Sequence, residues 1–179
     1  MNKQKLSDQI CEHHYAFIDY VSSLSDEDFE KSIQDKWTAG QQVEHMIKSV
    51  KPITQAFLLP NLLLKVIIGK SNREGRSYDE VVAKYHQKLE EGGKAPSRFV
   101  PRKINASQKS ELLKSLKKIT FTLSTQIENF SEEELDTLLL PHPLLGKLTL
   151  REMMYFTIYH VQHHHQKTIE NIKSKQALV

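Results

Sequence analysis

The sequence predicts an all-α protein, and two observations support this fold class. Apolar residues recur at intervals of three and four along several long segments, which is the spacing of amphipathic helices. No segment shows convincing alternation of apolar and polar residues bounded by hairpin signals, and no internal repeat is evident. A chain of 179 residues is long enough for one core and short for two, so we expect a single domain over residues 1–179.

The first half of the chain contains two helical segments separated by a polar turn. Residues 5–24 carry an apolar stripe at helical spacing, and residues 25–36 are mainly polar. Thr38 and Gln41 form a capping box that begins the second helix. Pro52 is expected to kink or divide this helix, because proline removes a backbone donor. Residues 53–68 are strongly apolar and are either deep core or a surface that faces a partner.

The second half begins with the polar turn 69–75, after which Ser77 can cap a helix that runs to about residue 91. Residues 92–106 include glycines and prolines and are expected to form a long crossover loop. Ser107 caps the third main helix, which extends to about residue 130. A short helix then ends before Pro141, residues 141–149 form a rigid connector, and Thr149 with Glu152 caps the final helix.

Composition limits the function classes. The net charge of +3 comes from lysines scattered among acidic residues, without the dense basic block that nucleic-acid binding requires, so no nucleic-acid partner is expected. Cys11 is the only cysteine, which excludes an internal disulfide and fits a reducing compartment. Because no signal peptide and no membrane-spanning run of about 18 apolar residues are seen, we expect a cytoplasmic protein that does not insert into membranes.

The final helix carries four of the histidines within residues 155–169. His160 and His164 are one turn apart, so they project from one face within roughly 40° of each other. This is the spacing of the two metal ligands in H-E-x-x-H sites, although the glutamate of that motif is missing here. The sequence pattern alone is equally consistent with a metal-binding pair and with a pair of buried structural histidines. His163 and His165 are expected to be surface residues.

His45, in the second helix, is ambiguous. Val43, Met46, Ile47 and Val50 form an apolar stripe, and His45 lies on the opposite side of the helix. Periodicity alone therefore predicts that His45 is exposed. A pocket wall built from small and polar residues would give the same pattern, so the sequence leaves both possibilities open.

Two separated motifs carry a family resemblance. The first is W-T-x-x-Q-x-V-x-H over residues 37–45, and the second is H-P-x-x-G-x-L-T over residues 142–149, followed by H-x-x-x-H-H from His160. Together they resemble the DinB/YfiT-like superfamily of metal-dependent enzymes over nearly the whole chain. The resemblance implies a four-helix bundle with a long crossover connection. It also implies that His45, His160 and His164 hold a divalent metal, with His163 as the substitute ligand.

Three imidazole ligands would leave coordination positions open to water or substrate, as in catalytic metal sites. Zinc, nickel and iron all accept such a set. The resemblance implies a thiol-dependent transferase that joins a low-molecular-weight thiol to a small electrophilic molecule, and a homodimer. The alternatives are a metal-dependent hydrolase of small amides or esters and a non-catalytic metal-binding homodimer. The catalytic base stays unassigned, with Glu44, His142 and His163 as candidates. The sequence is equally consistent with a structural role for His142, in which this residue fixes the connector.

Overall fold

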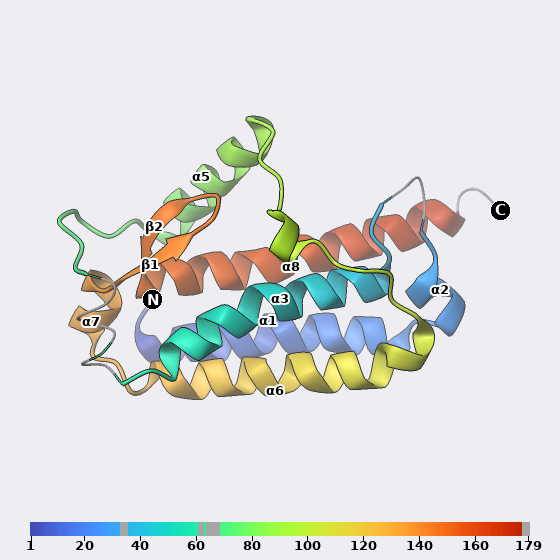
Figure 1. The fold of residues 1–179 in the computed structure, drawn as a ribbon, viewed down its shortest axis with the longest axis horizontal. Helices are drawn as coiled ribbons and strands as arrows, with labels where there is room; N and C mark the ends of the chain where they lie inside the picture. Colours follow the sequence, from blue (N-terminus) through green and yellow to red (C-terminus); the bar gives the residue numbers. More distant parts are fainter. Residues whose placement is uncertain (33–35, 61–62, 64–68, 177–179) are drawn as a thin grey trace.

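Four long helices form a bundle in the computed structural model, which describes the chain except for residues 33–35, 61–62, 64–68 and 177–179. Helices α1 and α3 each pack against both α6 and α8, and the four axes run along the long dimension of the molecule (Figure 1). The predicted all-α class is therefore confirmed. The bundle helices are α1 (Lys3–Ser23), α3 (Ala39–Phe57), α6 (Lys109–Ile127) and α8 (Leu150–Gln176).

Shorter elements connect the bundle helices. Helix α2 (Asp26–Glu30) precedes α3, and α7 (Glu132–Thr137) follows α6. The connection from α3 to α6 contains α5 (Tyr78–Glu90) and the 3₁₀ turns η1 (Ser97–Phe99) and η2 (Ala106–Gln108). After α5, this crossover passes over α3 and α8 at η1 before it reaches α6 (Figure 1). It therefore covers the face of the bundle where α3 and α8 meet.

The capping box predicted at Thr38 is present, and Ser77, predicted as a cap, also forms one with Glu80. The capping box predicted at Thr149 and Glu152 is present as well: the N–H of Glu152 donates to Oγ1 of Thr149 at 3.1 Å, and the N–H of Thr149 donates to Oε2 of Glu152 at 3.0 Å. Helix α3 continues through Pro52 to Phe57, so the proline does not divide it. Of the apolar segment 53–68, residues 61–62 and 64–68 lie outside the described part of the chain.

A small antiparallel hairpin replaces the connector expected at 141–149. Strand β1 (Leu139–His142) pairs with β2 (Gly146–Thr149), with His142 opposite Gly146. Two features close its turn: Nδ1 of His142 accepts the backbone N–H groups of Leu144 and Leu145, and Gly146 adopts φ +78°. Positive φ costs glycine little. The sequence did not predict a strand here, because both strands have only four residues and β2 does not alternate: Gly146 and Lys147 are exposed, and Leu148 and Thr149 are buried.

Candidate metal centre

Three histidines converge between α3 and α8. Nε2 of His160 lies 3.4 Å from Nε2 of His45 and 3.0 Å from Nε2 of His164. The candidate ligand atoms of all three residues lie within 4.8 Å of one another, and each side chain is buried. The structure thus brings together the three residues that the family resemblance selected. Their role as metal ligands stays a prediction.

The spacing fits a single metal ion. Two nitrogens that bind zinc at about 2.05 Å with a tetrahedral angle between them lie about 3.3 Å apart. The observed separations of 3.4 and 3.0 Å bracket this value, and all three candidate ligand atoms lie within 4.8 Å of one another, so the cluster suits one shared cation. Three histidines without a fourth protein ligand are typical of catalytic zinc sites.

Two of the rings are oriented by hydrogen bonds on the side away from the centre. Nδ1 of His45 lies 2.9 Å from the carbonyl oxygen of Phe99, and Nδ1 of His164 lies 2.5 Å from Oε1 of Gln42. Because both partners are acceptors, each Nδ1 donates a proton and each Nε2 keeps its lone pair for the centre. Metal-binding histidines are held in this way in proteins, and the outer partner also raises the basicity of the ligand.

The crossover accounts for the burial of His45, which is 4 % exposed. Around η1 the backbone is tied to α3 by two contacts: Nζ of Lys48 donates to the carbonyl of Val100 at 2.7 Å, and the backbone N–H of Arg102 donates to Glu44 at 2.7 Å. The expectation of an exposed His45 from periodicity is therefore wrong. Its face of α3 is covered by a segment distant in sequence, which a helical repeat cannot reveal.

Burial also sets the protonation state of the three rings. For each of the three imidazoles, desolvation has the largest influence on the pKa. It lowers the pKa of His45 and holds the pKa values of His160 and His164 well below 6.5. The mutual repulsion that protonated rings would experience acts in the same direction for His160 and His164. The imidazoles are therefore neutral at neutral pH, which is the form that binds a metal.

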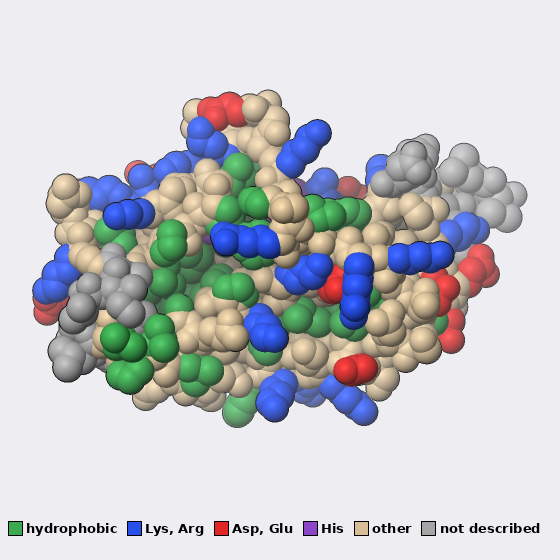
Figure 2. Space-filling view, viewed as in Figure 1, with side chains coloured by type: hydrophobic (Ala, Val, Ile, Leu, Met, Phe, Trp, Pro, Cys, Tyr) green, Lys and Arg blue, Asp and Glu red, His purple; other side chains and the backbone are tan. Residues whose placement is uncertain are grey.

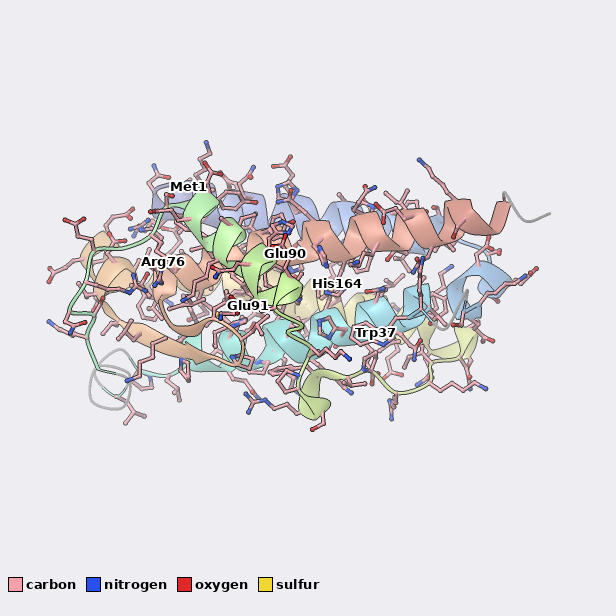
Figure 3. All side chains as sticks on the ribbon, turned by 90° about the horizontal axis from the view of Figure 1, so that it is seen from above. Met1, Trp37, Arg76, Glu90, Glu91 and His164 are labelled. Atoms are coloured by element: carbon pink, nitrogen blue, oxygen red, sulfur yellow. The ribbon has the colours of Figure 1, made fainter. Side chains whose placement is uncertain are left out.

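Aromatic rings surround the histidine cluster. Trp37 lies 4.9 Å from the His45 ring and is stacked on the His164 ring at 6.2 Å. Figure 3 labels Trp37 and His164, which lie close together. Phe156 is stacked on His160 at 4.7 Å, and Tyr85 meets the same ring edge-on at 6.0 Å. These contacts limit solvent access to the rings and lower the local dielectric, which strengthens electrostatic interactions there.

A cavity of about 1050 Å³ opens onto the cluster, and all three histidines line it. Its wall is built by α3, α5, the crossover, the hairpin and α8, so the connections as well as the bundle contribute to it. This volume is at the upper end of the range for small-molecule sites, roughly 300–1,000 Å³. The cavity is therefore large enough to place an organic molecule beside the three Nε2 atoms.

The three candidate bases differ in their surroundings. Glu44 binds Arg102 through both carboxylate oxygens, which fixes the crossover. His142 lines the cavity, but its Nδ1 closes the hairpin turn, which is the structural role considered for this residue. Burial lowers the pKa of His142 to about 4. His163 also lines the cavity, against Tyr85. Burial lowers the pKa of His163 to about 4.

Two histidines differ from the sequence expectation. His163 was expected on the surface, but it is half-buried beside the cavity. His165 was also expected there, and its ring instead packs against Phe17 and Tyr20 of α1 at 5.6 and 5.1 Å. Both differences have the same cause: α8 contacts α1, α3 and α5, so little of its circumference faces solvent.

The sequence reasoning also missed Gln42, the partner of His164. A signal for it was present, because Gln42 precedes His45 by one helical turn and therefore lies on the same side of α3. A polar residue one turn from a candidate ligand is a natural outer partner for a metal-binding histidine.

The fold and the site together define a helical bundle with a candidate three-histidine metal centre at the base of a cavity. A family model of the DinB superfamily matches residues 9–167, and the chain belongs to this superfamily. No curated protein and no solved structure shows a significant match. Among the described residues, no helix combines the length and the apolar character needed to cross a bilayer.

Proposed function

We propose that the protein is a metal-dependent enzyme in which His45, His160 and His164 bind one divalent cation, zinc, nickel or iron. The observation that carries this proposal is the convergence of three neutral Nε2 atoms at separations that suit one ion. Membership in the DinB superfamily supports it independently. The imidazole ligand set does not select among the three metals, since all of them accept nitrogen donors.

The proposed reaction is transfer of a low-molecular-weight thiol to a small electrophilic molecule. When bound, the cation would lower the pKa of a coordinated thiol or water, so that a nucleophile is available at neutral pH. The chain's own residues orient the ligand rings, through Gln42 and the Phe99 carbonyl, and limit water, through Trp37 and Phe156. The large cavity at the centre favours an enzyme over a purely structural metal site, which would be closed.

Two measurements on the full chain test this function. Protein purified without chelator should contain about one divalent metal per chain, and the His160→Ala variant should contain little. With cysteine or glutathione as the thiol and 1-chloro-2,4-dinitrobenzene as the electrophile, the metal-loaded protein should catalyse thioether formation. His13→Ala is the control, because His13 bonds to Gln9 on α1 and does not line the cavity.

The outcomes separate the candidate functions. Turnover that disappears in His160→Ala and survives in His13→Ala supports the transferase. Hydrolysis of a nitrophenyl ester without any thiol dependence would instead favour the hydrolase. A metal that raises the melting temperature of a protein inert toward all these substrates would favour the non-catalytic bundle.

We also propose that the chain forms a homodimer. Three large apolar side chains outside the cavity lining are exposed: Leu58 by 55 %, Leu63 by 44 % and Phe121 by 58 %. Exposed apolar surface of this kind supports a contact between two chains. Sedimentation equilibrium tests this directly, since a monomer at micromolar concentration contradicts it. The Phe121→Lys variant should weaken the dimer if α6 lies in the contact.

A further inference from the structure

The cavity at the candidate metal centre has two kinds of wall. One part, on the hairpin side of the histidines, is apolar. It extends along α3 and α8 away from His45 and His160 and is closed by the hairpin. Its lining residues include Ile53, Ala56, Leu59, Leu140, Leu144 and Met153.

The rest of the lining is rich in cationic side chains. They are Lys36, Lys48, Lys51, Lys94, Arg98 and Lys167, whereas Glu170 is the only acidic residue among the described residues of the lining. The whole chain is nearly balanced, with 25 lysines and arginines against 22 acidic residues, so this excess does not follow from composition. Figure 2 shows lysine and arginine side chains gathered on this face, around the hydrophobic surface that the crossover borders.

Several of these cations have no anionic partner. Within the described residues, Lys36, Lys51, Lys94 and Lys167 form no ion pair and donate no side-chain hydrogen bond. Positive charges around a cleft with low-dielectric walls raise the local concentration of anions from solution.

The positions of two lysines relate the charge to the apolar wall. Lys51 lies on α3 between His45 and Ile53 in the sequence, Lys94 lies on the crossover just after α5, and both line the cavity. A molecule with its apolar part against Ile53 and Leu140 would therefore have cationic groups near it from both α3 and the crossover. A purely polar anion would leave the apolar wall without contacts.

We infer that the cavity binds an amphipathic organic anion, whose apolar body packs against the hairpin side and whose acidic group pairs with Lys51 and Lys94. This inference rests on the proposed function and deepens it, because it names the class of electrophile or product that the site accepts. A neutral molecule of the same shape would gain the apolar contacts and lose the ion pairs.

Octanoate and octanamide are suitable probes, because they share the apolar chain and differ in the charge of the head group. Their binding should be measured by isothermal titration calorimetry, on protein treated with chelator and on zinc-loaded protein. Binding to the chelator-treated protein reports the contribution of the lysines, because in the zinc-loaded protein the carboxylate could also bind the metal directly. The test variant is Lys51→Gln/Lys94→Gln. Its matched control is Lys114→Gln/Lys118→Gln, the same charge change at two exposed lysines of α6 outside the cavity.

In the chelator-treated wild type, octanoate should bind at least about tenfold more tightly than octanamide. The Lys51→Gln/Lys94→Gln variant should lose about threefold to tenfold in octanoate affinity and keep its octanamide affinity, as expected for two partly exposed ion pairs. The control pair should match the wild type. Added salt should weaken octanoate binding more than octanamide binding.

Three results would overturn the inference: no octanoate binding, equal affinities for octanoate and octanamide, or equal losses in the test and control pairs. Its failure is distinguishable from failure of the proposed function. A protein that prefers octanoate and binds no metal refutes the metal-dependent enzyme alone. A protein that binds metal and catalyses thioether formation, without preference for the anion, refutes this inference alone.

Discussion

Gln42 provides the sharpest test of the candidate metal centre, because it touches a proposed ligand without being one. Its Oε1 accepts the Nδ1 proton of His164 at 2.5 Å, and its side chain is 3 % exposed. Gln42→Ala removes this acceptor, so the His164 ring can rotate or shift its proton to Nε2, the atom that faces the centre. Loss of an outer partner of this kind lowers metal affinity about 10- to 100-fold, or about 1.4–2.7 kcal/mol.

Zinc affinity should be measured by competition with a chromophoric chelator, together with the thermal stability of the metal-free protein. Gln42→Glu should restore or exceed wild-type affinity, since a carboxylate is a stronger acceptor for the same proton. The matched control is Gln41→Ala, which removes the neighbouring capping-box amide. It should cost stability and leave zinc affinity unchanged. If Gln42→Ala and Gln41→Ala change zinc affinity equally, the proposed orientation of His164 is refuted.

Three further predictions concern the scaffold. Burial lowers the pKa of His14 to about 4, so below pH ~6.5 the unfolded chain binds a proton that the folded chain does not. Stability should therefore fall by up to about 3 kcal/mol between pH 6.5 and 4, and urea melts of His14→Leu should show a flatter profile; an unchanged profile contradicts this cause. Glu152→Ala should cost about 2–3 kcal/mol in chemical denaturation, because this buried carboxylate accepts from both terminal guanidinium nitrogens of Arg73 at 2.6 Å and from the backbone N–H of Thr149 at 3.0 Å. A loss below about 1 kcal/mol would show that the pair is dispensable. Gly40→Ala should lower the melting temperature despite better helix propensity, since the new Cβ would lie 2.8 Å from the Phe29 ring; a rise would show that this contact relaxes freely.

Local signals in the sequence predicted much of the fold. The caps predicted at Thr38, Ser77 and Thr149 place three helix starts correctly, because the side chains that satisfy the first N–H groups are close in sequence. The β-hairpin was missed. Its turn depends on the hydrogen bonds that His142 accepts and on the positive φ of Gly146, and neither follows from apolar periodicity.

In the candidate site, too, one feature was predicted from local sequence and another was not. The pairing of His160 and His164 followed from helical geometry, because they lie one turn apart on α8. The convergence of His45 followed only from the family resemblance. Periodicity failed for His45 because tertiary structure determines its exposure: the crossover that buries it begins many residues later and is fixed by contacts to Lys48 and Glu44.

The crossover is therefore part of the candidate metal centre as well as a connection. Its Phe99 carbonyl orients His45, and Lys94 and Arg98 from the same segment line the cavity beside the histidines. Metal binding to a correctly oriented His45 should then stabilise the observed position of this segment, since whatever binds one conformation shifts the equilibrium toward it. Weakening the Glu44–Arg102 contact should in turn reduce metal affinity, although neither residue touches the histidine nitrogens that face the centre. Hydrogen exchange of the backbone N–H groups of Phe99, Val100 and Arg102 should accordingly slow when zinc is added. Equal exchange with and without the metal would show that the crossover and the histidine cluster act independently.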